Sequence, residues 1–186
     1  MARWSGDPWH SRGTRIQAHH RRMVDDDIRI RRVTPGDAAA LERFYAELSA
    51  SSRALRFLCA SRGIGRQQAV EFAAADHKAR DGFVAVAGDR VIGHVVLEPL
   101  GDQTEELAIA VDDAAQHHGV GTLLVGAAVA SARLRRIRHL VAWVKTDNSP
   151  MRRLLAASPH ARHVTWDGSV ARYELTVEPR AHRSAA

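Results

Sequence analysis

The chain has 186 residues, of which 45% are apolar, and this is enough for one domain with one sizeable core. No apolar run approaches the roughly 18 residues that a membrane-spanning helix needs, so we expect no membrane association. The formal net charge is +6, but five arginines against one aspartate in residues 1–22 supply most of it. Because a nucleic-acid-binding domain concentrates positive charge on its fold, we expect no specific nucleic-acid partner.

The composition also predicts the domain boundaries. Residues 1–27 are rich in Arg, His, Gly and Ser and show no helical or strand period, which predicts a disordered basic extension. We expect one domain over residues 28–177 and a flexible tail over residues 178–186. The single cysteine, Cys59, excludes an intramolecular disulfide and suits the reducing cytoplasm, and its apolar helical context predicts a buried packing thiol.

Hydrophobic periodicity predicts an α/β domain. In chain order we expect a strand over residues 28–33, helices over residues 34–48, 51–58 and 67–76, and a hairpin with strands over residues 83–87 and 91–97. A second series follows, with a strand over residues 106–111, a helix over residues 119–136, a strand over residues 139–144, a helix that begins near residues 148–150, and a closing hairpin over residues 162–177. The strand, loop, helix and strand of residues 106–144 are the order that a parallel crossover requires.

The stretch Gln116-His117-His118-Gly119-Val120-Gly121 leads from a predicted strand directly into a helix start. Backbone N–H groups at a helix N-terminus lack intrahelical partners and attract anions, and glycines allow close approach to the backbone. The stretch is no dinucleotide fingerprint, because Leu124 stands where a third glycine would be required, and no P-loop, because Ala127 replaces the lysine. Adjacent histidines project apart, so we expect no metal site at His117 and His118.

Gln116-x-x-Gly119-x-Gly121 resembles the Q/R-x-x-G-x-G/A signature of the GNAT superfamily of N-acetyltransferases. The resemblance implies a mixed, largely antiparallel central sheet with helices on both faces, and acetyl-CoA as the cosubstrate. It implies that Ile109, Ala110 and Val111 offer backbone groups to the pantetheine arm. It also implies that the pyrophosphate is held by seven loop residues: Gln116, His117, His118, Gly119, Val120, Gly121 and Thr122. The resemblance further implies that Asn148 contacts the cofactor.

Acetyl transfer requires a neutral amine, and an amine with a pKa near 10 needs a group that takes its proton. Strand alternation places Glu106 on one face with Ala108 and Ala110, small residues that leave space beside it. Bacterial protein-lysine acetyltransferases, which the chain resembles, use a glutamate there as general base; the alternative is a solvated carboxylate at a strand end. His94 is the reserve candidate, and Glu105 is expected to face solvent on the opposite side.

The position at which many members of the superfamily carry a tyrosine near the departing thiolate is Leu155 here. Solvent would then protonate the thiolate. Arg152 and Arg153 are candidates for the 3′-phosphate of the cofactor or ordinary surface arginines.

The leading hypothesis is a cytoplasmic acetyl-CoA-dependent N-acetyltransferase that acts by direct attack of a primary amine, either a protein lysine or a small molecule. The alternative is a non-catalytic module of the same fold that binds an acyl-CoA as a sensor or interaction domain. A homodimer is compatible with either hypothesis, since dimers are the commonest soluble assembly.

Overall fold

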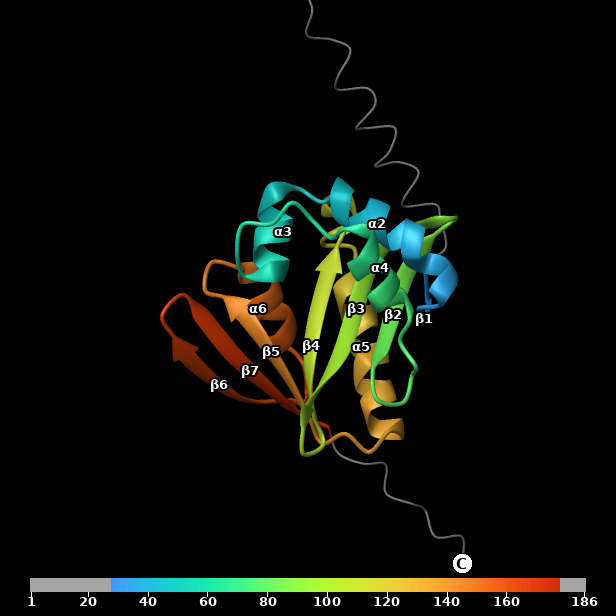
Figure 1. Cartoon of the computed structure of the whole chain (residues 1–186). Helices are drawn as coiled ribbons and strands as arrows, with labels where there is room; N and C mark the ends of the chain where they lie inside the picture. Colours follow the sequence, from blue (N-terminus) through green and yellow to red (C-terminus); the bar gives the residue numbers. More distant parts are fainter. Residues whose placement is uncertain (1–27, 178–186) are drawn as a thin grey trace, which may run out of the picture.

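The computed structural model describes residues 28–177, and the expectations for residues 1–27 and 178–186 lie outside this range. Seven strands of the described chain form one sheet (Figure 1): β1 (Arg29–Arg32), β2 (Asp81–Ala87), β3 (Arg90–Gly101), β4 (Thr104–Val111), β5 (His139–Lys145), β6 (Ala161–Asp167) and β7 (Val170–Thr176). The helices are α2 (Ala38–Glu47), α3 (Ala50–Phe57), α4 (Arg66–Ala73), α5 (Val120–Leu134) and α6 (Ser149–Ala156), with short 3₁₀ turns η1 (Pro35–Asp37) and η2 (Asp113–Ala115).

The strand order is β1-β2-β3-β4-β5-β7-β6. Neighbouring strands are antiparallel except β4 and β5, which are parallel and are joined through α5. This confirms the mixed, largely antiparallel sheet and the predicted crossover. The helix α5 packs on one face of the sheet, and α2, α3 and α4 lie over the other (Figure 1).

The start of α5 lies unusually close to the sheet because β3 carries a glycine beneath it. A Cβ atom at Gly93 would be 2.9 Å from Cδ1 of Leu124 and 3.1 Å from Cγ1 of Val120. A larger residue at this position would require these two side chains, or the helix that carries them, to move. Gly93 therefore lets the first turn of α5, with the predicted anion-binding loop before it, sit directly against the end of β4.

The expectation that Glu105 faces solvent is wrong. The residue lies on the face opposite Glu106, as predicted, but that face is covered by α5, so Glu105 is 1% exposed rather than solvent-facing. Arg135, at the C-terminal end of α5, meets both of its carboxylate oxygens, with 2.7 Å between Nη2 and Oε2. A buried carboxylate requires such a partner, and here the pair ties the end of α5 to β4.

Cys59 corrects another expectation, because it is exposed rather than buried. The helix α3 ends at Phe57, and Leu58 has a φ of 60°, the left-handed conformation that terminates many helices. Cys59 therefore follows the helix in a turn instead of packing on its apolar face. No helix within residues 28–177 is both long and apolar enough to cross a membrane.

Candidate active site

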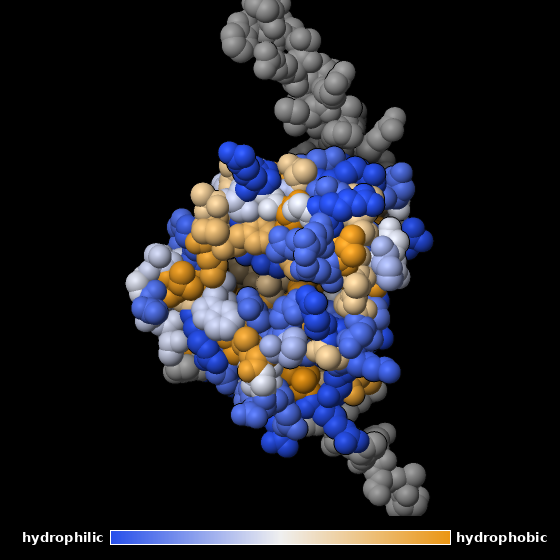
Figure 2. Space-filling view, viewed as in Figure 1, coloured by the Kyte–Doolittle hydropathy of each residue, from blue (hydrophilic) through white to orange (hydrophobic). Residues whose placement is uncertain are grey.

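The candidate site occupies a gap between the two parallel strands. Pairing between β4 and β5 begins at Thr104 and His139 and ends at Glu106 and Val141, after which the strands diverge (Figure 1). A cavity of about 540 Å³ fills this gap, and its walls come from β4, β5, α3, the start of α5, and α6. Figure 2 shows the surface hollowed below α3 and beside β4.

The divergence leaves part of β4 without a strand partner on the side of β5. Ile109, Ala110 and Val111 line the cavity there, together with Ala108. The Val111 carbonyl accepts a hydrogen bond of 3.3 Å from Nε2 of Gln116, and the other backbone groups that face this side can pair with an extended ligand as another strand would. The structure therefore brings these three predicted residues to the position that an amide-containing pantetheine arm requires.

The loop before α5 has the backbone conformation of an anion-binding turn. His117 and Gly119 have φ angles of 66° and 81°, and α5 begins at the next residue, Val120. Left-handed residues beside a helix start turn successive N–H groups toward one point. Of the predicted loop residues, five line the cavity: Gln116, His117, Gly119, Gly121 and Thr122.

Two predicted loop residues lie elsewhere. The side chain of Val120 is buried in the core beneath α5, and His118 does not line the cavity. A role of Val120 in binding would thus rest on its backbone N–H group.

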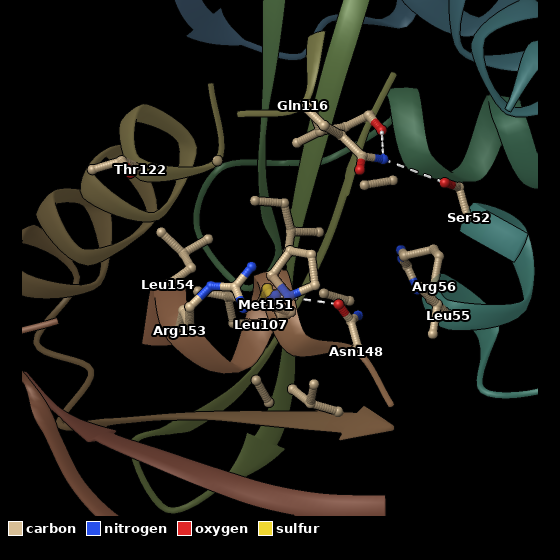
Figure 3. A pocket seen from close by; sticks show the side chains of 18 of the residues that line it. Ser52, Leu55, Arg56, Leu107, Gln116, Thr122, Asn148, Met151, Arg153 and Leu154 are labelled. Atoms are coloured by element: carbon tan, nitrogen blue, oxygen red, sulfur yellow. Dashed lines mark hydrogen bonds between the residues drawn. The ribbon is translucent and has the colours of Figure 1, made fainter. Parts of the chain in front are cut away.

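The loop is tied to α3 by contacts that the sequence did not indicate. Asp113 accepts hydrogen bonds of 2.8 Å from the backbone N–H of Ser49 and of 2.6 Å from Oγ of Ser52. Gln116 donates from Nε2 to the same Ser52 oxygen at 3.3 Å (Figure 3). Burial raises the pKa of Asp113, but the hydrogen bonds from Ser49 and Ser52 lower it more, so the carboxylate stays ionised. The loop and α3 consequently form one connected wall.

Glu106 lies at the point where β4 and β5 part, and it lines the cavity with Ala108 and Ala110 as predicted. Within residues 28–177 no side chain or backbone group makes a hydrogen bond with its carboxylate that would hold it in place. Burial raises its pKa, and Glu98 on the adjacent strand raises it further, whereas the positive charge of Arg56 lowers it. Glu106 is thus a half-buried, freely available carboxylate with increased basicity.

His94 lies away from the cavity, in the core beneath α2 and α4. Its Nδ1 is 3.0 Å from the hydroxyl of Tyr45. Burial lowers the pKa of His94 to about 3, so the ring is neutral near pH 7, and the tautomer of the ring sets which of the two groups donates in this hydrogen bond. The structure gives His94 a packing and hydrogen-bonding contact, and it brings only Glu106 of the two predicted catalytic residues to the cavity.

The helix α6 forms the wall opposite α3 (Figure 3). Asn148 lines the cavity while its Oδ1 accepts the backbone N–H of Met151 at 3.2 Å, so it also caps the helix. Arg153 faces the cavity, whereas the Arg152 guanidinium lies 5.0 Å from the centre of the Trp166 ring. Arg153 is the member of this pair that is placed to meet a bound cofactor.

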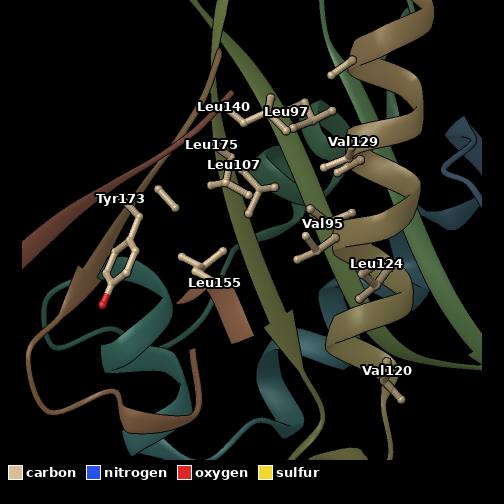
Figure 4. Packing of buried hydrophobic residues seen from close by; sticks show 14 of the residues in the cluster. Val95, Leu97, Leu107, Val120, Leu124, Val129, Leu140, Leu155, Tyr173 and Leu175 are labelled. Carbon is tan, nitrogen blue, oxygen red and sulfur yellow. The ribbon is translucent and has the colours of Figure 1, made fainter. Parts of the chain in front are cut away.

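Leu155 is fully buried against the sheet (Figure 4). It packs in the core between α6 and the strands around β5, together with Leu140 and Leu175. The position therefore contributes packing, and no hydroxyl group reaches the cavity from it.

A strand edge and a helix start converge on one cavity, an arrangement that suits an extended ligand with an anionic end. The sequence model of the acetyltransferase (GNAT) family matches residues 41–157, and the chain belongs to this family. A comparison with curated protein sequences found no match.

Solved structures of the family are similar to the chain. The GNAT domain of PAT from S. lividans is 27% identical with a TM-score of 0.74, over 80% of this chain and 90% of that one. The putative acetyltransferase yncA from Salmonella typhimurium, solved with acetyl-CoA, is 17% identical with a TM-score of 0.65, over 86% and 99%. The PaiA N-acetyltransferase of Thermoplasma acidophilum, solved with coenzyme A, is 16% identical with a TM-score of 0.65, over 81% and 99%.

Proposed function

We propose that the protein transfers an acetyl group from acetyl-CoA to a primary amine, with Glu106 as the general base. The observation that carries the proposal is the position of Glu106, a half-buried carboxylate in the cavity where β4 and β5 diverge. Membership of the family and the acetyl-CoA and coenzyme A bound to the Salmonella and Thermoplasma proteins support the choice of cosubstrate.

The proposed reaction is a direct transfer. The pantetheine arm pairs with the free edge of β4, and the N–H groups at the start of α5 receive the pyrophosphate. Glu106 takes a proton from the ammonium form of the acceptor, and the neutral amine nitrogen then attacks the thioester carbonyl and forms the C–N bond. The C–S bond breaks, and the nitrogen loses its second proton to solvent. Because Leu155 offers no hydroxyl, the CoA thiolate takes its proton from solvent.

The acceptor is a primary amine on a protein lysine or on a small molecule. The 27% identity to a domain of a protein named PAT supports the lysine, and the open cavity admits either acceptor. The single cysteine of the chain supports action in the reducing cytoplasm.

The Glu106→Gln variant tests this proposal. Gln keeps the size of Glu106 but cannot take a proton, so we expect kcat to fall by about 10²–10⁴-fold. The dissociation constant for coenzyme A should stay within about twofold, since the charge lies away from the loop that receives the pyrophosphate. The matched control is Glu71→Gln, at an exposed position of α4, and this variant should keep the full rate.

The rival function is an acyl-CoA sensor of the same fold without turnover. The absence of a hydroxyl at Leu155 is the observation that favours it. Release of free thiol from acetyl-CoA, followed with a panel of amines, separates the two functions. A wild-type protein that binds acetyl-CoA but releases no thiol with any amine would favour the sensor.

A further inference from the structure

The wall of the cavity that α3 forms carries a positively charged side chain, Arg56, which lies beside aromatic rings. Arg56 lines the cavity from α3, and its guanidinium carbon lies 5.1 Å from the centre of the Phe57 ring and 6.0 Å from that of Phe72. The Tyr45 hydroxyl lies beside the same guanidinium and is held on its other side by His94. Such stacking orients a planar guanidinium more strictly than solvent would.

Among the described residues Arg56 has no carboxylate partner at ion-pair distance, and it differs from Arg53 and Arg152, which bond to backbone carbonyl oxygens, in that it lines the cavity. Arg31, Arg80 and Arg135 each pair with an aspartate or glutamate. Within the described part of the chain, no carboxylate lies within ion-pair distance of Arg56, and its buried Nε has no hydrogen-bond partner. A partly desolvated cation without a counter-ion is costly, and a planar guanidinium fork fits a carboxylate in a bidentate geometry.

The position of Arg56 in the cavity suggests that it contacts the acceptor rather than the phosphates of the cofactor. Arg56 lies on the same face of the sheet as Glu106 and acts electrostatically on that residue. The first turn of α5, which is proposed to receive the pyrophosphate, belongs to the helix on the opposite face. An acceptor whose amine approaches Glu106 would therefore carry its other groups past α3, where Ser52, Leu55 and Arg56 lie (Figure 3).

We propose that Arg56 binds a carboxylate of the acceptor, so that the enzyme selects amines that carry a carboxylate over simple alkylamines. This inference rests on the proposed acetyl transfer to an amine at Glu106. The carboxylate belongs either to a small amino acid or to an acidic side chain beside a lysine in a protein. In both cases the guanidinium fixes one end of the acceptor while Glu106 receives the proton at the other.

The test uses the full chain and pairs of acceptors that differ only in the carboxylate. Each ω-amino acid, from β-alanine to 6-aminohexanoate, is compared with the n-alkylamine of the same chain length by thiol release from acetyl-CoA. A second arm compares short peptides that contain Glu or Gln next to one lysine. We expect at least one pair, in either arm, for which the wild-type kcat/KM is at least about tenfold higher for the acceptor with the carboxylate than for the acceptor without it. A difference of about tenfold is typical for one charge-assisted hydrogen bond.

The Arg56→Met variant should bring this ratio to about one, and Arg56→Lys should lose most of it because lysine lacks the bidentate fork. The control is Arg66→Met, which removes an exposed charge whose weak ion pair with Glu42 measures 3.9 Å and should keep the wild-type ratio. Unchanged coenzyme A affinity shows that the variants are folded. An equal ratio in wild type and Arg56→Met, or a wild-type ratio near one in both arms, would overturn the inference.

A second measurement separates this inference from the proposed function. If the wild type released no thiol with any amine, acetyl transfer would be wrong, yet the carboxylate site could still be measured by binding. Calorimetry with the CoA-loaded protein and the N-acetylated ω-amino acids should then show at least about tenfold tighter binding to wild type than to Arg56→Met. Equal affinities would exclude Arg56 as a carboxylate-binding residue whatever the activity.

Discussion

Substitutions at Gly121 distinguish the effect of bulk from the effect of charge at the proposed pyrophosphate site. Gly121 lines the cavity in the first turn of α5, and a Cβ atom there would lie 3.1 Å from Cδ2 of Leu154. Because that atom is the end of a flexible side chain, Gly121→Ala needs only a small shift of Leu154. Alanine is also favoured over glycine in a helix by about 1 kcal/mol, so this variant should fold well and bind coenzyme A nearly as wild type does.

Gly121→Gln and Gly121→Glu add the same bulk, and only Glu adds a negative charge. At about 5 Å and an effective dielectric constant of about 20, repulsion between two unit charges is about 3 kcal/mol, or roughly 100-fold in a dissociation constant. We therefore expect coenzyme A to bind the Glu variant about 100-fold more weakly than the Gln variant. Calorimetry measures both affinities, and the thermal midpoint of each variant verifies folding.

The comparison between Gln and Glu decides the assignment of the loop. Equal coenzyme A affinity of the two variants would mean that no phosphate lies near Gly121. The anion-binding interpretation of the turn would then be wrong, even if the bulk alone weakened binding.

Three further predictions follow from the charged groups. Because burial raises the pKa of Glu106, kcat/KM should fall as the pH decreases, with a midpoint above the usual carboxyl range. The Glu98→Gln variant should lower that midpoint, because it removes a repulsive charge. A pH–rate profile of each protein measures both effects. Glu105→Gln should lower the free energy of unfolding by about 3 kcal/mol, because it leaves Arg135 buried with a weakened partner, and urea denaturation measures the loss. Asp113→Asn should cost about 1–3 kcal/mol in the same assay and weaken coenzyme A binding, because it breaks the charge-assisted bonds that tie the loop to α3.

The loop could be predicted because its chemistry is local. A glycine at position 119 directly before an apolar helix and a second one at position 121 in its first turn specify a turn and a helix start with few alternatives, and Gly119 indeed adopts a positive φ. The face on which Glu106 lies followed from strand alternation, which depends only on neighbouring residues. These features needed no knowledge of distant parts of the chain.

The environment of Glu105 and Arg56 could not be predicted because distant segments create it. Glu105 is buried by the end of α5, where Arg135 is one of four arginines between positions 133 and 138 and nothing local distinguishes it from the others. Arg56 follows an ordinary helical pattern, and its distinguishing feature is that it lines the cavity with no carboxylate of the described chain within ion-pair distance. Sequence spacing cannot reveal such an absence, since it depends on which surfaces the fold brings together.

The single parallel pair in an otherwise antiparallel sheet accounts for the location of both halves of the site. Parallel strands need a long crossover, and α5 supplies it, so its first turn must lie near the end of β4 from which the chain leaves the sheet. The divergence of β4 and β5 after Glu106 and Val141 then leaves a strand edge without a partner beside that helix start. The same divergence opens space over Glu106, so the gap that is proposed to admit an extended cosubstrate also contains a carboxylate with raised pKa.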